Sequence, residues 1–150
     1  MSNIESTITV SLPDGSSREL AAPATALDLA ASIGSGLRKA AVAATVNGVE
    51  TDLTRELADG DVVAIITNDT DAGRHVLRHS TAHVLAQAVT QLYPGAKFSI
   101  GPAIENGFYY DFDLQHRITP EDFPAIEAEM KKEIKANHTF EKVVVTRDQA

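Results

Sequence analysis

The stretch AVAATVNGVET, residues 41–51, decides the fold of the first half of this chain. Ala41 to Val46 is apolar and strand-like, and Val49 to Thr51 continues in the same manner beyond Asn47-Gly48. Asn-Gly between two such runs is the strongest short-range signal for a β-hairpin, because both residues tolerate the positive φ that a tight turn requires. Residues 41–51 are therefore predicted to form a hairpin.

The segments before this hairpin predict two further strands and one helix. Residues 8–12 alternate apolar and polar side chains, as in a half-buried strand, and a Pro-Asp-Gly-Ser turn leads to a short strand at residues 18–21. Thr25 and Asp28 form a capping-box pattern that opens a helix, and Gly34-Ser35-Gly36 is expected to end it.

A turn at residues 59–61 then precedes a last strand, Val62 to Thr67, which is rich in β-branched residues. Two strands, a helix, a hairpin and a last strand follow the order of a ubiquitin-like β-grasp, in which one helix lies across a mixed sheet. No residue in this unit has a catalytic pattern, so a binding or docking role is expected for it.

Composition bounds the class of protein. A chain of 150 residues that is 43% hydrophobic can hold one domain or two small ones. The absence of cysteine excludes a disulfide framework and fits a reducing compartment. The sequence has no apolar run of the ~20 residues that a membrane span needs and no secretory signal pattern, so a cytoplasmic protein is expected.

The charge is distributed unevenly. Residues 1–70 carry four Lys/Arg and ten Asp/Glu, a net charge of −6, whereas residues 71–150 carry nine and eleven, a net charge of −2. This asymmetry suggests two units. The acidic first unit argues against a strong nonspecific grip on nucleic acid, which depends on cations at phosphates.

Two histidines four residues apart, His79 and His83, lie in a stretch predicted to be helical from residue 71 to Leu92. Side chains at this spacing share one helix face, and His75 falls on the same stripe one turn earlier. Imidazoles, which ordinarily titrate near pH ~6.5, are suited to proton transfer. The alternative is that these are ordinary surface or hydrogen-bonded core histidines.

Metal chemistry has weaker support in the sequence. A zinc-protease helix needs Glu directly after its first His, where this chain has Ser80. Structural zinc sites take four ligands, often thiolates, and the chain has no cysteine. Further ligands would have to come from His75, His116, His138 or carboxylates, and no spacing singles one out.

Residues 98–113 predict a second hairpin, around Asn106-Gly107. A two-residue loop at Asn106-Gly107 would mix the two faces of the hairpin. A three-residue loop, Glu105 to Gly107, pairs Ile104 with Phe108 and collects apolar side chains on one face, as a buried sheet requires. We therefore predict the three-residue loop, with Gly107 in the left-handed conformation.

The last third of the chain predicts a helix and a strand. Thr119-Pro120 is a good helix start, Phe140 to Val145 is strand-like, and Thr146 to Gln149 has a capping-box pattern that no helix follows. A hairpin and two helices cover a sheet poorly. Residues 70–150 are therefore expected to be the front part of a larger domain, and the chain a fragment.

The whole chain closely resembles the N-terminal region of bacterial threonyl-tRNA synthetases. The resemblance is carried by RHSTAH at residues 78–83, IGP at residues 100–102 and NGFYYD at residues 106–111. It implies an α+β chain: a TGS β-grasp domain at residues 1–69, then the first part of an editing domain, a β-hairpin with two helices, at residues 70–150.

The resemblance also implies a function and a site. The family's editing domain hydrolyses seryl-tRNA(Thr), and His79 and His83 match the first two members of a His/His/Cys/His cluster whose other members are absent here. They are the candidate catalytic residues and possible metal ligands of an incomplete set. Tyr110 is a candidate substrate-binding residue at the edge of the pocket.

Cofactors and partners follow from the same resemblance. No cofactor is expected in this segment, since ATP, Mg²⁺ and the catalytic zinc would belong to a core outside it, and the isolated chain is expected to be inactive in aminoacylation. The expected partners are tRNA(Thr) and the remainder of a synthetase that is a homodimer, with no membrane. The alternatives are a TGS-led RNA-binding module without chemistry, or a zinc-dependent hydrolase.

Overall fold

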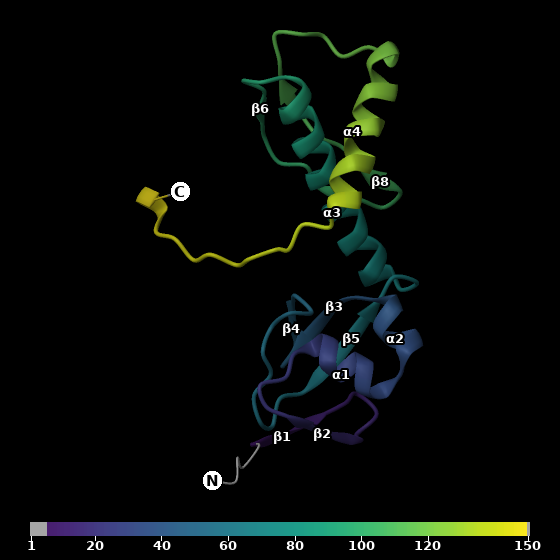
Figure 1. The fold of residues 1–150 in the computed structure, drawn as a ribbon, viewed down its shortest axis with the longest axis vertical. Coiled ribbons are helices and arrows are strands. Elements are labelled where there is room, and N and C mark those ends of the chain that lie inside the picture. The colour runs from purple at the N-terminus through teal and green to yellow at the C-terminus, as the bar shows by residue number, and fades with distance from the viewer. Residues whose placement is uncertain (1–5, 150) are drawn as a thin grey trace. The chain divides into compact units, whose positions relative to one another are not determined.

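The structure is a computed structural model that describes residues 6–149. Packing divides the chain into two compact units, and the division falls between His79 and Ser80 (Figure 1). The division falls inside a helix, α3 (Asp71–Leu92). The domain boundary that we placed between residues 69 and 70 stays a prediction.

The first unit contains the predicted strands and helix in the predicted order, together with one helix, α2 (Ser35–Ala40), that was not predicted. They are β1 (Thr7–Ser11), β2 (Ser17–Ala21), α1 (Ala26–Ile33), α2 (Ser35–Ala40), β3 (Ala41–Val46), β4 (Val49–Thr51) and β5 (Val63–Thr67). β1 pairs antiparallel with β2, and β3 lies between β4 and β5. A parallel bridge between Ser11 and Val62 joins the two groups, which confirms the β-grasp.

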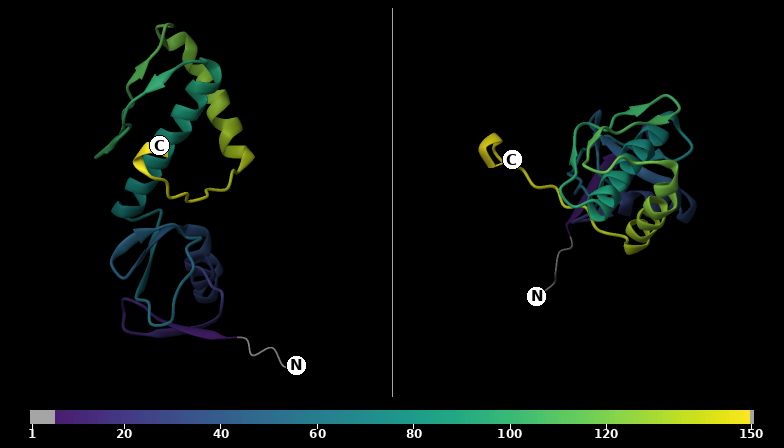
Figure 2. Two further views of the ribbon diagram at one scale, coloured as in Figure 1. Left: turned by 90° about the vertical axis from the view of Figure 1, so that its left-hand side faces the viewer. Right: turned by 90° about the horizontal axis from the view of Figure 1, so that it is seen from above.

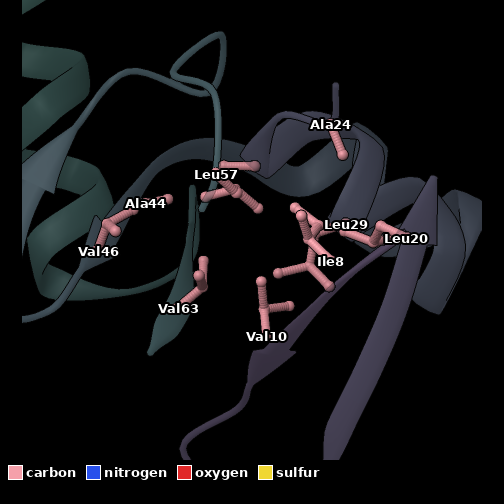
Figure 3. Close-up of a cluster of buried hydrophobic side chains, with 10 residues drawn as sticks. Ile8, Val10, Leu20, Ala24, Leu29, Ala44, Val46, Leu57 and Val63 are labelled. Carbon is pink, nitrogen blue, oxygen red and sulfur yellow. The ribbon is translucent and has the colours of Figure 1, made fainter. Parts of the chain in front are cut away.

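Apolar side chains from both groups of strands and from α1 make one core (Figure 3). Its fully buried members include Val10, Leu29, Val46 and Val63. Burying a side chain of this kind contributes about 1.5–3 kcal/mol. The alternation in residues 8–12 and the apolar run in residues 41–46 therefore predict the core correctly.

The hairpin turn at residues 47–48 forms as expected. Asn47 and Gly48 have φ of 52° and 80°, and Val46 pairs with Val49. The Asn47 side chain has a second role, because its Nδ2 donates to the buried Asp61 carboxylate at 2.8 Å and its Oδ1 accepts from the Val62 N–H at 2.9 Å. The turn is thereby tied to the start of β5.

Helix α1 starts at the predicted capping box, but a second helix follows it. The Thr25 N–H donates to Asp28 at 2.8 Å, and the Asp28 N–H donates to the Thr25 hydroxyl at 3.3 Å. Gly34 ends α1 with extended backbone and also precedes α2. We expected residues 34–36 only to stop a helix, whereas Leu37 to Ala40 are good helix formers and restart one.

A short turn at residues 68–70 connects β5 to helix α3. The Gly73 N–H donates to the Thr70 hydroxyl at 3.0 Å, and that hydroxyl donates to the Thr67 carbonyl at 2.8 Å. The helix ends before Pro94-Gly95, where Gly95 has a φ of 89°. Its extent, Asp71–Leu92, confirms the predicted helix.

The hairpin of the second unit differs from our prediction. Strand β6 (Lys97–Phe98) pairs with β9 (Phe112–Asp113), and β7 (Ala103–Ile104) pairs with β8 (Gly107–Phe108). Ile104 lies opposite Gly107, so the loop has two residues, Glu105 and Asn106. Gly107 is not among the glycines with positive φ. The prediction of a three-residue loop with Gly107 in the left-handed conformation is therefore wrong.

The physical reason is that our premise of a buried face does not hold. Ile100 is 77% exposed and Ile104 is 48% exposed, although both belong to the face that was predicted to be buried. Burial of one face is what specifies strand register strongly. Without it, the apolar pattern could not select the loop.

The last helix starts where the sequence places it. Thr119 caps a short 3₁₀ turn, η1 (Pro120–Asp122), which leads into α4 (Phe123–Ala136). Ile126 of α4 is buried, and together with Met130 it lines an apolar groove shared with Leu85 and Val89 of α3. Figure 2 shows α4 beside the C-terminal half of α3.

Beyond α4 the chain runs extended (Figure 2). The predicted strand at residues 140–145 is wrong, since the structure assigns no strand there and both Phe140 and Val144 are 85% exposed. A strand needs a partner, and within the described part of the chain this segment has none. The Thr146 capping pattern does form, and it precedes η2 (Arg147–Gln149).

Within residues 6–149, no helix combines the length and the apolar character needed to cross a membrane.

Candidate functional site

The candidate catalytic histidines lie on α3. His79 and His83 are one helical turn apart, and both are exposed. At this spacing their Cβ atoms are roughly 5–6 Å apart, close enough for both rings to reach one water molecule or one hydroxyl group. His75 continues the exposed stripe one turn earlier.

Several residues near His83 on α3 are buried. Ala82, Ala86 and Val89 are buried in the second unit. His83 lies between two of these positions along the chain, so it borders the packed face of the helix. Of the two candidate catalytic histidines, His83 is therefore the one shown to lie beside buried residues of α3.

The described residues do not complete a metal site around the histidines. Within residues 6–149, no group of three or more His, Asp or Glu side chains is arranged to hold a metal ion. A catalytic zinc takes three protein ligands and a structural zinc takes four. The assignment of His79 and His83 as possible metal ligands stays a prediction.

Tyr110 lies in a cluster of aromatic rings. Its ring stacks on Phe112, with centroids 5.0 Å apart and an interplanar angle of 17°. It also meets Phe98 edge-on, with centroids 6.0 Å apart. Tyr110 and Phe112 line an open pocket of about 510 Å³ that continues to Ile118. Tyr110 is thus at the wall of a pocket whose lining residues do not include His79 or His83.

Sequence reasoning missed a polar cluster around Asp122. His116 Nε2 lies 3.0 Å from the Asp122 carboxylate, and its ring stacks on Tyr93 with centroids 5.0 Å apart. The Thr119 N–H donates to the same carboxylate at 2.8 Å. Thr119-Pro120 indicated a helix start, but no periodicity relates His116 or Tyr93 to it.

This cluster has a clear electrostatic signature. The Thr119 backbone N–H, and after it the hydrogen bond from His116, lowers the pKa of Asp122 to about 2. Partial desolvation and the nearby Asp122 carboxylate raise the pKa of Tyr93. Asp122 is therefore a carboxylate at neutral pH, and it orients the ring of His116.

Comparison with known proteins finds similarity that extends over both units. Residues 8–67 match the model of the TGS domain. The chain is similar to threonine–tRNA ligases of Gluconacetobacter diazotrophicus (52% identity over 141 residues, 94% of this chain and 22% of the relative) and Maricaulis maris (55% over 144 residues, 95% and 22%). The ligase of Geobacillus kaustophilus is 46% identical over 143 residues. The chain spans about a fifth of the length of these relatives.

Proposed function

We propose that this chain, which contains a TGS domain and is closely homologous to the N-terminal region of bacterial threonyl-tRNA synthetases, serves as the N-terminal part of a threonine–tRNA ligase. In that role its residues 70–150 supply part of the site that hydrolyses mischarged seryl-tRNA(Thr).

The observation that carries this proposal is the extent of the similarity. A β-grasp alone would leave the function open, because one fold serves many functions. Here 52% identity extends over 94% of the chain, and thus well beyond the TGS match at residues 8–67. Helix α3 with its exposed histidines, and the second unit that follows, are therefore included in the similarity to the ligases.

The need for such a site follows from physical chemistry. Threonine and serine differ by one methyl group, and a single apolar group discriminates between substrates only ~10–200-fold. A ligase that must be more accurate than this needs a second, hydrolytic step. Removal of serine from tRNA(Thr) is that step.

The chemistry proposed for the histidines is ester hydrolysis. Water attacks the seryl carbonyl carbon, the ester C–O bond breaks, and the terminal ribose oxygen leaves with a proton. His79 and His83 position the attacking water and the neighbouring ribose hydroxyl, and one imidazole transfers the proton, directly or through a water molecule. Tyr110 borders the site that binds the tRNA end.

The same proposal covers cofactors, partners and location. ATP, Mg²⁺ and zinc serve the aminoacylation core and not this segment. The partners are tRNA(Thr) and the rest of the ligase, which acts as a cytoplasmic homodimer without membrane attachment.

The test replaces His79 by alanine in the full-length ligase that carries this chain. We expect deacylation of seryl-tRNA(Thr) to fall by about 10²–10⁴-fold, the usual contribution of a general acid–base group, while threonylation is unchanged. His83→Ala should behave similarly. His75→Ala, on the same exposed stripe, is the matched control and should retain deacylation.

Deacylation at the normal rate in His79→Ala would contradict the assignment. A wild-type ligase that binds tRNA but does not deacylate seryl-tRNA(Thr) would instead support an RNA-binding module. Stoichiometric zinc in the purified chain would support the zinc-dependent hydrolase.

A further inference from the structure

We propose that Gly101 is a positioning residue for the hydrolytic site: it holds the Tyr110 ring against the peptide backbone and thereby presents Tyr110 to the sugar–phosphate end of the aminoacylated tRNA. This inference rests on the proposed function. It assigns a role to Gly101, which the proposed function by itself does not.

The geometry around Gly101 leaves no room for a side chain. A Cβ atom built on Gly101 would lie 2.1 Å from Cδ2, 2.2 Å from Cε2 and 2.9 Å from Cγ of Tyr110. Gly101 is itself buried. Its φ is not in the positive range, so the requirement for glycine here is one of space and not of backbone conformation.

Two more contacts hold the same ring. Phe112 stacks on it and Phe98 meets it edge-on, which are the two arrangements that aromatic pairs prefer. Phe98 and Phe112 are paired residues of β6 and β9. The tyrosine ring is thus held by the two-stranded sheet and by the backbone at Gly101.

Such a ring is fixed before any ligand arrives. Tyr110 also lines the pocket of about 510 Å³ that runs to Ile118, a size within the range of small-ligand sites. A side chain whose position is set by its neighbours loses little entropy on binding. Since a misplacement of about 1 Å can cost 10²-fold in rate, the missing Cβ at Gly101 matters for catalysis.

The same hairpin provides a matched control glycine. A Cβ built on Gly107 meets nothing within 4 Å, and Gly107 does not have positive φ. Gly107→Ala therefore adds the same methyl group to the same hairpin without touching Tyr110.

The first arm of the test measures the contact itself in the 150-residue chain. The Tyr110 ring current should shift an α-proton resonance of Gly101 in the NMR spectrum, and Tyr110→Leu should remove that shift. An unchanged Gly101 resonance in Tyr110→Leu would overturn the inference, whatever the chain does as an enzyme.

The second arm measures deacylation in the full-length ligase with a double-mutant cycle. Gly101→Ala should lower kcat/KM for seryl-tRNA(Thr) by about 10²-fold while Gly107→Ala has no effect, and both should threonylate normally. Tyr110→Ala makes room for the added methyl group. The double variant should therefore deacylate like Tyr110→Ala alone, to within about twofold.

The outcomes separate the two proposals. Losses that multiply in the double variant would show that Gly101 does not act through Tyr110 and would overturn the inference. If His79→Ala abolishes deacylation but Gly101→Ala does not, the inference fails and the proposed function stands. If His79→Ala deacylates normally, the proposed function fails. If Gly101→Ala does not fold, recovery of folding in the double variant still supports the contact.

Discussion

Position 73 requires a glycine because the surrounding backbone leaves no room for a side chain. A Cβ there would lie 1.9 Å from the carbonyl oxygen of Thr67 and 3.1 Å from the Thr70 hydroxyl oxygen. Both atoms belong to the hydrogen bonds that join β5 to α3. The helix can begin this close to the strand only because residue 73 lacks a side chain.

Two glycine-to-alanine substitutions should therefore change the free energy of unfolding in opposite directions. Gly36 lies in α2, and a Cβ there meets nothing within 4 Å. Gly36→Ala should raise the free energy of unfolding by about 0.5–1 kcal/mol, the usual helix preference for alanine. Gly73→Ala should lower it by about 1–3 kcal/mol, because backbone must shift to admit the methyl group.

Urea unfolding followed by circular dichroism gives both values. A Gly73→Ala variant as stable as the wild type would show that the β5–α3 connection relaxes without cost. A lower free energy of unfolding for Gly36→Ala would contradict the prediction, because it would show that α2 requires glycine at this position although no atom lies within 4 Å of the added Cβ.

At the scale of elements, the start of α4 depends on one carboxylate. Asp122 accepts hydrogen bonds from the Thr119 N–H and from His116, and its pKa is lowered to about 2. A carboxylate with a lowered pKa stabilises the fold at pH values above its ordinary pKa of about 3.9. That stabilisation is lost as the pH falls through about 2.

We therefore predict an acid transition at the start of α4. The Asp122 side-chain ¹³C resonance should titrate with a midpoint of about 2, and the helical signal of residues 123–126 should weaken over the interval below pH ~4. Asp122→Asn should remove this pH dependence. Glu121→Gln, in the same turn, should leave it unchanged, and a midpoint near 4 for Asp122 would contradict the cap.

The elements also show where local patterns fail. The Thr25 cap was predicted from the spacing of Thr25 and Asp28, because a capping box closes within three residues, and the Thr119 start from the proline that follows it. The strand register of the hairpin at residues 98–113 was not predicted correctly, because register depends on which side chains cover the sheet. Ile104 is about half exposed, so the face on which the apolar residues gather is not fully buried. The apolar pattern therefore predicted a three-residue loop where the structure has a two-residue loop.

At the scale of the whole molecule, the two units bury very different amounts of apolar surface. The largest fully buried side chains are Val10, Leu29, Val46 and Val63 in the first unit and Val89 in the second. Many large apolar side chains of the second unit are exposed, including Phe98, Phe123 and Ile134. We infer that the first unit is the more stable.

A single core substitution should expose this difference. Leu29→Ala should destabilise the first unit by about 2–5 kcal/mol, since Leu29 is fully buried. Native-state hydrogen exchange should then speed up in residues 41–67 and stay unchanged in residues 80–92. Val89→Ala should give the reciprocal pattern. Equal acceleration of both segments would mean that the units unfold together.

The sequence by itself determined the β-grasp, the extent of α3, the capped starts of α1 and α4, and the pairing of His79 with His83 on one helix face. Each of these depends on interactions within a few residues, or on an alternation that buries one face. The TGS match at residues 8–67 agrees with that result.

Only the tertiary structure decided the hairpin register, the extended course of residues 140–145, and the contacts of Gly101 with Tyr110 and of His116 with Asp122. These depend on which surfaces meet across the fold, and no local propensity encodes such meetings. A glycine looks alike in a turn, at a helix start and beneath an aromatic ring until the atoms opposite it are known.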